Sequence, residues 1–145
     1  MKPAKSLKRK EGPNMAKVYA MIANGTEEVE CLAVVDLLRR SGVETVLVSV
    51  EEDCEIISSH KVRITADAVL ADTDLSDGDV IFLPGGMPGA ERLSACGPLL
   101  EALEQADREG RRIAAICAAP GVVLGRHGLL KGRTATCFPG FEKEF

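Results

Sequence analysis

Residues 111–120 read RRIAAICAAP and place a single cysteine, Cys117, between a short apolar run and a segment of small residues. The run at 111–116 predicts a buried parallel strand, because strands covered on both faces are nearly continuous in apolar residues. The small residues and the proline that follow predict a helix that begins at Ala118. A sharp turn from strand to helix would hold the cysteine up at the end of the strand.

A thiol at that turn would be chemically reactive. The N–H groups and the positive dipole at the start of a helix favour thiolate over thiol, and thiolate is the nucleophilic form. The same strand-turn-helix geometry exposes the serine of a nucleophile elbow, although the flanking glycines of that motif are absent here. The alternative is that Cys117 is a small buried apolar residue, as most free cysteines are.

A second turn follows the apolar run at 79–83, where residues 83–86 read LPGG. Ligands of open α/β sheets bind outside the carboxyl ends of the strands, so this turn and Cys117 are expected to converge. Paired glycines let backbone N–H groups approach a developing negative charge, and Gly85 and Gly86 therefore predict an oxyanion pocket. An ordinary tight turn is the alternative. The segment lacks the spacing of a dinucleotide fingerprint and of a P-loop.

The first apolar run leads to a carboxyl group. Residues 17–23 predict a strand, followed by a turn and a helix over 28–40 with Thr26 as its N-cap. Glu30 is predicted to lie on an apolar face of that helix and to be buried. Burial disfavours the charged form, so Glu30 is expected to stay protonated near neutral pH and to donate a hydrogen bond to a nearby thiolate. Its neighbours on that face are Ala33, Val34, Leu37 and Leu38.

Strand and helix patterns alternate along the rest of the chain. A strand is predicted over 45–50, a hairpin over 54–66, a helix over 98–109 and a further strand near 133–138. This alternation predicts an α/β fold with one doubly wound, mostly parallel sheet and helices on both faces.

Length and composition set limits on the classes of protein. The chain has 145 residues, of which 46% are hydrophobic and 28% charged, which fits one globular domain with a real core. The net charge is −4 and basic residues are not gathered on the folded part, so neither nucleic acid nor an anionic membrane is an expected partner. No apolar run reaches the ~20 residues that span a bilayer.

The cysteines indicate a redox environment. The chain has five, an odd number, with no CxxC pair and no metal-ligand spacing. This pattern predicts free thiols in a reducing compartment, and hence a cytoplasmic protein. No metal site and no cofactor is expected.

The first fourteen residues differ in composition from the rest. Residues 1–14 are basic and poor in apolar side chains, which predicts a disordered extension ahead of an α/β domain over 15–145. Met15 reads as an alternative start. A targeting peptide is the other interpretation, although the segment has a single arginine and a single serine.

Three motifs in combination carry a family resemblance. Residues 24–30 read NGTEEVE, residues 83–86 LPGG and residues 115–120 AICAAP. In this order they resemble the ThiJ/PfpI superfamily, and within it the branch of the Parkinsonism-associated protein deglycase and its bacterial relatives. The resemblance covers about residues 16–139. It implies a flavodoxin-like fold, also described as class I glutamine amidotransferase-like, from which this chain lacks the last elements.

The resemblance also implies a chemistry. It implies that Cys117 is a redox-sensitive nucleophile, that Glu30 is the protonated carboxyl beside it, and that the N–H groups of Gly86 and Ala118 form the anion pocket. The implied activity is glyoxalase or deglycase action on reactive dicarbonyls such as methylglyoxal, or on glycated substrates, by a homodimer. A redox sensor or holdase-like stress protein that uses oxidation of Cys117, or an inactive fragment, remains as the alternative.

Some residues of this chain differ from those of other members of the superfamily, and these differences argue against a peptidase or an amidotransferase. Peptidase-like members carry a histidine directly after the nucleophile, where this chain has Ala118. Amidotransferase members need a downstream His-Glu pair that this chain does not contain. The resemblance implies that His60, in the predicted hairpin, is an accessory residue of the site, contributed either by the same chain or by the partner subunit. Members of the branch continue for several elements beyond the predicted strand at 133–138, so the domain is expected to be incomplete at its C-terminal end.

Overall fold

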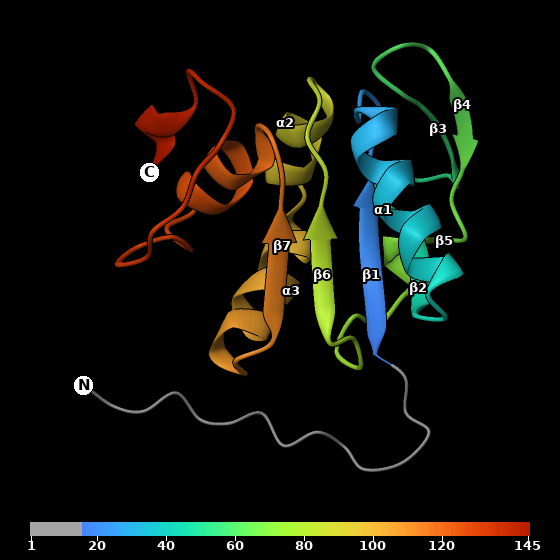
Figure 1. The fold of residues 1–145 in the computed structure, drawn as a ribbon, viewed down its shortest axis with the longest axis horizontal. Coiled ribbons are helices and arrows are strands. Elements are labelled where there is room, and N and C mark those ends of the chain that lie inside the picture. The colour runs from blue at the N-terminus through green and yellow to red at the C-terminus, as the bar shows by residue number, and fades with distance from the viewer. Residues whose placement is uncertain (1–15) are drawn as a thin grey trace.

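The computed structural model describes residues 16–145, and the extension predicted over 1–14 lies outside them. Five parallel strands form one sheet in the order β5-β2-β1-β6-β7 (Figure 1). The predicted doubly wound, mostly parallel sheet is therefore confirmed. The bounds of the strands are β1 Lys17–Ile22, β2 Glu44–Ser49, β5 Ala68–Val69, β6 Val80–Leu83 and β7 Arg112–Ala115.

Helices lie on both faces of this sheet (Figure 1). Helix α1, Glu28–Arg40, covers one face, while α2, Gly89–Ser94, and α3, Gly97–Arg108, cover the other. The predicted hairpin is also present, as the antiparallel strands β3, Glu55–Ile57, and β4, Arg63–Thr65. Short helical turns complete the chain: η1 Leu70–Asp72, η2 Pro120–Gly125 and η3 Glu142–Glu144.

The central strand β1 explains why the sheet is packed on both faces. It pairs with β2 and with β6 in parallel, and Val18 to Ile22 are all buried. Alternate residues of β1 enter two different cores, with Tyr19 and Met21 on the α3 side and Ala20 and Ile22 on the α1 side. A strand with two buried faces needs the continuous apolar run that the sequence displays.

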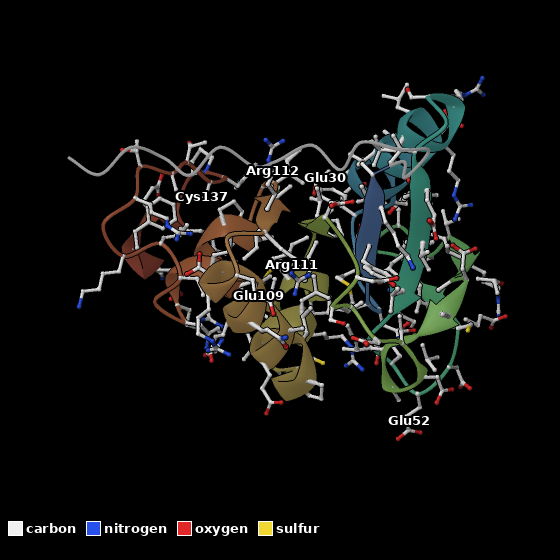
Figure 2. All side chains as sticks on the ribbon, turned by 90° about the horizontal axis from the view of Figure 1, so that it is seen from below. Glu30, Glu52, Glu109, Arg111, Arg112 and Cys137 are labelled. Carbon is white, nitrogen blue, oxygen red and sulfur yellow. The ribbon has the colours of Figure 1, made fainter. Side chains whose placement is uncertain are left out.

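Strand β7 is covered less completely than the sequence predicts. It pairs with β6 alone among the described strands, and Arg112, Ala114 and Ile116 are exposed on its α1 side. Figure 2 shows Arg112 on the same side of the sheet as Glu30 of α1, and Arg111 and Glu109 on the opposite side, near α3. The prediction of a strand near 133–138 is wrong, since that segment forms neither helix nor strand and lies outside the sheet.

Two local details of the first helix also differ from prediction. The N-cap is Glu27, whose Oε2 accepts from the backbone N–H of Glu30 at 3.1 Å, and not Thr26. Thr26 is fully buried and its Oγ1 accepts from the N–H of Ala23 instead. In addition, none of the helices in residues 16–145 combines the length and apolar character needed to cross a bilayer.

A bidentate ion pair joins three segments at the carboxyl edge of the sheet. Glu51, just beyond β2, accepts from Arg92 of α2 through both of its oxygens, one of them at 2.6 Å from Nε, and from the backbone N–H of Asn24 at 2.9 Å. The Arg92 guanidinium lowers the pKa of the half-buried Glu51 carboxyl, and the Asn24 N–H adds to the effect. The ends of β1 and β2 and the helix after β6 are therefore held together.

Replacing Glu51 by Gln should lower the free energy of unfolding by about 1–3 kcal/mol near neutral pH, the typical value of charge-assisted hydrogen bonds. Because the folded pKa of Glu51 is lowered, this stabilisation is complete above the ordinary carboxyl pKa and is lost as the pH falls through the folded value. The difference in urea stability between wild type and Glu51→Gln should thus be larger at about pH 7 than at about pH 3. Glu52→Gln is the control, because Glu52 is exposed and points away from the fold (Figure 2). An equal difference at both pH values would contradict the assignment.

Candidate functional site

The loops after β1, β6 and β7 meet at the carboxyl edge of the sheet, as the sequence predicts. The backbone N–H of Glu27 donates to the Gly85 carbonyl at 3.0 Å, and the N–H of Ile116 donates to the Leu83 carbonyl at 3.2 Å. These two bonds connect the first loop to the second and the second to the third. In the sheet, β2 and β5 lie on one side of β1, and β6 and β7 lie on the other. The loops therefore meet where the strand order reverses, which is the usual ligand position in doubly wound sheets.

Cys117 stands on a strained turn directly after β7. Its φ is +62°, in the left-handed region that residues other than glycine rarely adopt, and the N–H of Ala119 closes the turn on the Ile116 carbonyl at 3.2 Å. This conformation costs about 1–2 kcal/mol. The helical turn η2 begins at Pro120 rather than at the predicted Ala118, so Ala118 and Ala119 separate Cys117 from it. Strain of this kind is typical of residues that the fold must present for function.

Glu30 reaches the same place from the first turn of α1. Its carboxylate Oε2 accepts from the backbone N–H of Gly85 at 2.9 Å. The apolar helix face predicted to bury Glu30 is not buried, since Ala33 and Leu37 on that face are exposed. The side chain is half-buried because it lies against the loop after β6.

Gly85 allows the thiol and the carboxyl group to lie side by side. A Cβ at residue 85 would lie 2.6 Å from the Cβ of Cys117 and 2.7 Å from Oε2 of Glu30. Both separations are shorter than any real contact of a Cβ atom. Any side chain at this position would therefore push the two groups apart.

Backbone N–H groups of Ala118 and Gly86 donate toward the sulfur of Cys117. Gly86 has a φ of +87°, and a Cβ there would lie 2.2 Å from the backbone nitrogen of Glu27, so only glycine fits. Of the three N–H groups predicted for the anion pocket, the structure brings those of Gly86 and Ala118 to the sulfur. That of Gly85 is different, because it binds Glu30.

The net electrostatics around Cys117 differ from the prediction. Burial raises the pKa of the Cys117 thiol, and the Glu30 carboxylate raises it further by hydrogen bonding and by its charge. The N–H groups of Ala118 and Gly86 lower the pKa but do not compensate. The N–H groups of the turn therefore do favour thiolate, but burial and the neighbouring Glu30 outweigh them.

His60 is not beside Cys117 in this chain. Its Nδ1 lies 2.9 Å from Oε1 of Glu28 and 3.5 Å from Oε1 of Glu27, on an exposed imidazole. Burial alone would raise the pKa of Glu28, but hydrogen bonds from Ser58, Ser59 and backbone N–H groups prevail and lower it. The three side chains form a group that could hold a metal ion within the described residues. A direct accessory role of His60 has no contact to support it.

The C-terminal segment contributes residues that sequence reasoning missed. The backbone N–H of Phe138 donates to the Cys117 carbonyl at 2.7 Å. Phe141 and Cys117 pack against the same buried cluster of Ala90, Ala118 and Val122. The segment lies at the carboxyl end of β7 (Figure 1). No spacing in the sequence links residues 138–141 to Cys117.

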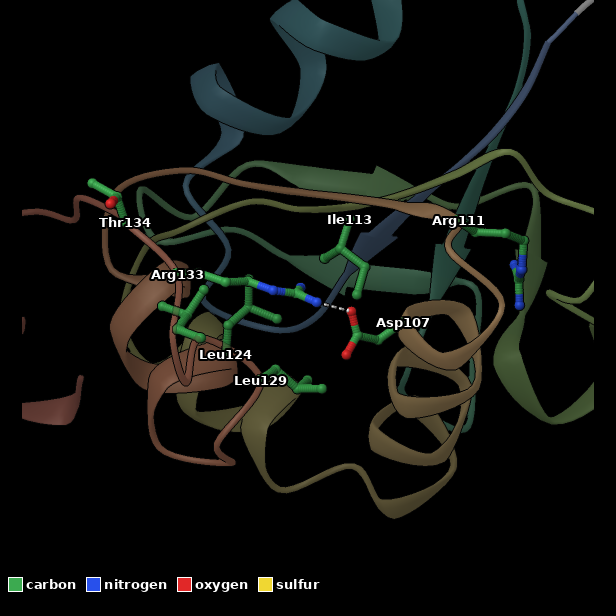
Figure 3. Close-up of a pocket in the computed structure, with 8 residues that line it drawn as sticks. Asp107, Arg111, Ile113, Leu124, Leu129, Arg133 and Thr134 are labelled. Atoms are coloured by element: carbon green, nitrogen blue, oxygen red, sulfur yellow. Dashed lines mark hydrogen bonds and ion pairs between the residues drawn. The ribbon is translucent and has the colours of Figure 1, made fainter. Parts of the chain in front are cut away.

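Two cavities of the described fold are lined by residues other than Cys117. A cavity of about 170 Å³ opens between α3, β7 and the chain after η2, where Arg133 Nη2 donates to Asp107 Oδ1 at 2.5 Å (Figure 3). A second, of about 380 Å³, lies at the carboxyl edge and is lined by Asn24, Met87 and residues of the hairpin. Neither is lined by Cys117 or Glu30. The thiol therefore lies outside both cavities.

Together, the fold and the three loops define a doubly wound α/β protein with a cysteine on a strained turn at the carboxyl edge of the sheet. Residues 16–145 match the sequence profile of the DJ-1/PfpI family, and the chain belongs to that family.

Known proteins agree with this assignment. Protein DJ-1 homolog B of Arabidopsis thaliana is 42% identical over 88% of this chain and 29% of its own length. The glutathione-independent glyoxalase DJR-1.2 of Caenorhabditis elegans is 35% identical over 77% of this chain and 58% of its own length. The solved structure of oxidized Toxoplasma gondii DJ-1 superposes with a TM-score of 0.87 at 41% identity, over 90% of this chain and 71% of that one. The chain thus spans about a third of the plant relative it matches.

Glu30→Gln should lower the pKa of the Cys117 thiol, because the neutral amide removes a charge that opposes the thiolate. The rate of Cys117 alkylation by iodoacetamide, followed by mass spectrometry across a pH series, should then rise at lower pH than in wild type. Glu28→Gln is the control, since Glu28 binds the hairpin and not the thiol. A shift to higher pH in Glu30→Gln would instead mean that a protonated Glu30 donates to the thiolate, as the sequence predicts.

Proposed function

We propose that this chain is a cysteine-dependent glyoxalase- or deglycase-like protein that acts on methylglyoxal-type dicarbonyls or their adducts. The observation that carries the proposal is the contact of Gly85 with both partners, which places the Cys117 thiol beside the Glu30 carboxyl. A thiol with a raised pKa needs an adjacent base, and Glu30 is placed to be that base. One relative bears the name of a glutathione-independent glyoxalase.

The reaction begins with transfer of the Cys117 proton to Glu30. The resulting thiolate adds to the aldehyde carbon of the α-oxoaldehyde, and the oxyanion that forms is stabilised by the N–H groups of Gly86 and Ala118. Protonated Glu30 returns its proton to this oxygen, which yields a hemithioacetal. The reacting pair is thus a Cys117 thiolate and a protonated Glu30.

Glu30 then completes the conversion as a general base. It removes the C1 proton of the hemithioacetal, and reprotonation at C2 gives a 2-hydroxyacyl thioester on Cys117. Water hydrolyses the thioester, releases the 2-hydroxy acid and restores the thiol. Aldehyde oxidation and ketone reduction balance within the substrate, so no cofactor is required. For a dicarbonyl adduct on a protein side chain, the Cys117 thiolate would displace the amine or thiol at C1 while protonated Glu30 protonates the leaving group, which yields the same hemithioacetal.

We also propose that the protein acts as a homodimer in the cytoplasm. Four large apolar side chains are exposed on α1 and on the neighbouring hairpin, where a second copy would cover them: Val29, Leu37, Ile57 and Val62. The five cysteines are all free thiols, which is typical of a reducing compartment.

Cys117→Ala should abolish methylglyoxal consumption by the folded protein, and Glu30→Gln should slow it by about 100-fold or more, the usual contribution of a general base. Circular dichroism confirms folding before each assay. Cys54→Ala, which removes a half-buried thiol of the hairpin region, should retain wild-type turnover. Undiminished consumption in Cys117→Ala would refute the proposal.

A redox-sensor role is the second candidate, and the name of the oxidized Toxoplasma gondii relative favours it. A sulfinate at Cys117 would receive the same two N–H groups that face the thiol. Low peroxide should then oxidise Cys117 before the other cysteines, above all before Cys31, whose thiol pKa burial raises to about 12. Peptide mass spectrometry after graded peroxide measures the order, and equal oxidation of all five cysteines would count against this role.

A further inference from the structure

Apolar side chains are exposed at the turn that carries the thiol. Ile116 precedes Cys117 and has 43% of its surface exposed, and Phe138 is 55% exposed. The backbone bond from Phe138 to the Cys117 carbonyl, 2.7 Å long, places this aromatic residue next to the turn that carries the thiol. Exposed apolar groups at a reactive centre indicate a surface for an apolar ligand group.

A second aromatic ring fixes the first. The rings of Phe138 and Phe141 have centroids 6.4 Å apart with a tilt of 60°, an attractive edge-to-face arrangement. Phe141 is held in turn by Gly121, where a Cβ would lie 2.7 Å from the Phe141 carbonyl oxygen. The ion pair between Arg126 and Glu144, at 3.0 Å, holds the end of the same segment. The aromatic pair therefore has a defined position.

Polar and apolar groups near Cys117 thus come from different segments. Glu30 on the first turn of α1 serves the proton, and the N–H groups of Gly86 and Ala118 on the loops after β6 and β7 serve the oxyanion. Phe138 and Phe141 belong to the C-terminal segment and carry no titratable group. An α-oxoaldehyde has the same division, with a reacting aldehyde at one end and a substituent on the ketone at the other.

We propose that Phe138 and Phe141, with Ile116, bind the ketone substituent of the substrate and make the site prefer aromatic α-oxoaldehydes over methylglyoxal. This inference rests on the proposed function. A phenyl substituent can pack edge-to-face on the exposed ring of Phe138, whereas a methyl group gains little from it. The structure thereby assigns the specificity of the site to the C-terminal segment and its chemistry to the three loops.

Turnover with two substrates tests the preference. Wild type should have a kcat/KM for phenylglyoxal about tenfold above that for methylglyoxal, and Phe138→Ala should reduce this ratio to about 1 to 2. Phe141→Leu keeps an apolar side chain beside Phe138 while it removes the aromatic ring, and it should reduce the ratio in part. Phe145→Ala is the matched control, because Phe145 is similarly exposed at 52% and packs on Gly125, away from Cys117. An unchanged ratio in Phe138→Ala would overturn the proposal.

Alkylation of Cys117 separates this inference from the proposed function. Phenacyl bromide and bromoacetone differ only as phenyl and methyl ketones, and the rate of each at Cys117 is divided by its rate with N-acetylcysteine. Wild type should favour phenacyl bromide about tenfold after this correction, and Phe138→Ala should lose the preference while Phe145→Ala keeps it. That result without any turnover would reject the enzyme and retain the aromatic site. No preference in wild type would reject the aromatic site whatever the turnover.

Discussion

The absence of a side chain at Gly85 is the constraint on which the site depends. Its N–H binds Glu30 at 2.9 Å, and the space of its missing Cβ is filled by Glu30 on one side and Cys117 on the other. Glu30 and Cys117 are 87 positions apart in the sequence, and they lie close together only because backbone without a side chain passes between them. The parallel sheet supplies this backbone, since β6 lies between β1 and β7 and ends at the same edge.

The electrostatics of the site follow from that contact. A half-buried thiol beside a carboxylate holds its proton more tightly than a free cysteine does, and two N–H donors reduce this effect without removing it. The pair is therefore better described as a proton donor and its acceptor than as a preformed thiolate. Such a thiol stays protected from indiscriminate alkylation and becomes nucleophilic when the carboxyl group takes its proton.

The sequence predicts the parts of the fold that local patterns determine. These parts are the apolar runs of β1, β6 and β7, the hairpin, and the turn at Gly85 and Gly86. They can be predicted because strand burial requires runs of apolar residues and unusual backbone conformations require glycine. The wrong predictions concern tertiary context. Residues 133–138 have strand-forming side chains but find no neighbour in the sheet, and Thr26, the predicted N-cap, is buried and accepts from Ala23 instead. The contacts of Phe138 and Phe141 with the turn at Cys117 link segments about twenty residues apart that share no periodicity, so no pattern could reveal them.

The positive φ of Cys117 presents a reactive thiol but lowers the stability of the fold at the same residue. Glycine occupies that region of backbone space without cost, so a glycine in this position would relax the turn and make the chain more stable while deleting its thiol. Selection for durability alone would therefore drive the chain toward an inert variant. A cysteine on such a turn therefore presents a thiol at the expense of the stability of the fold.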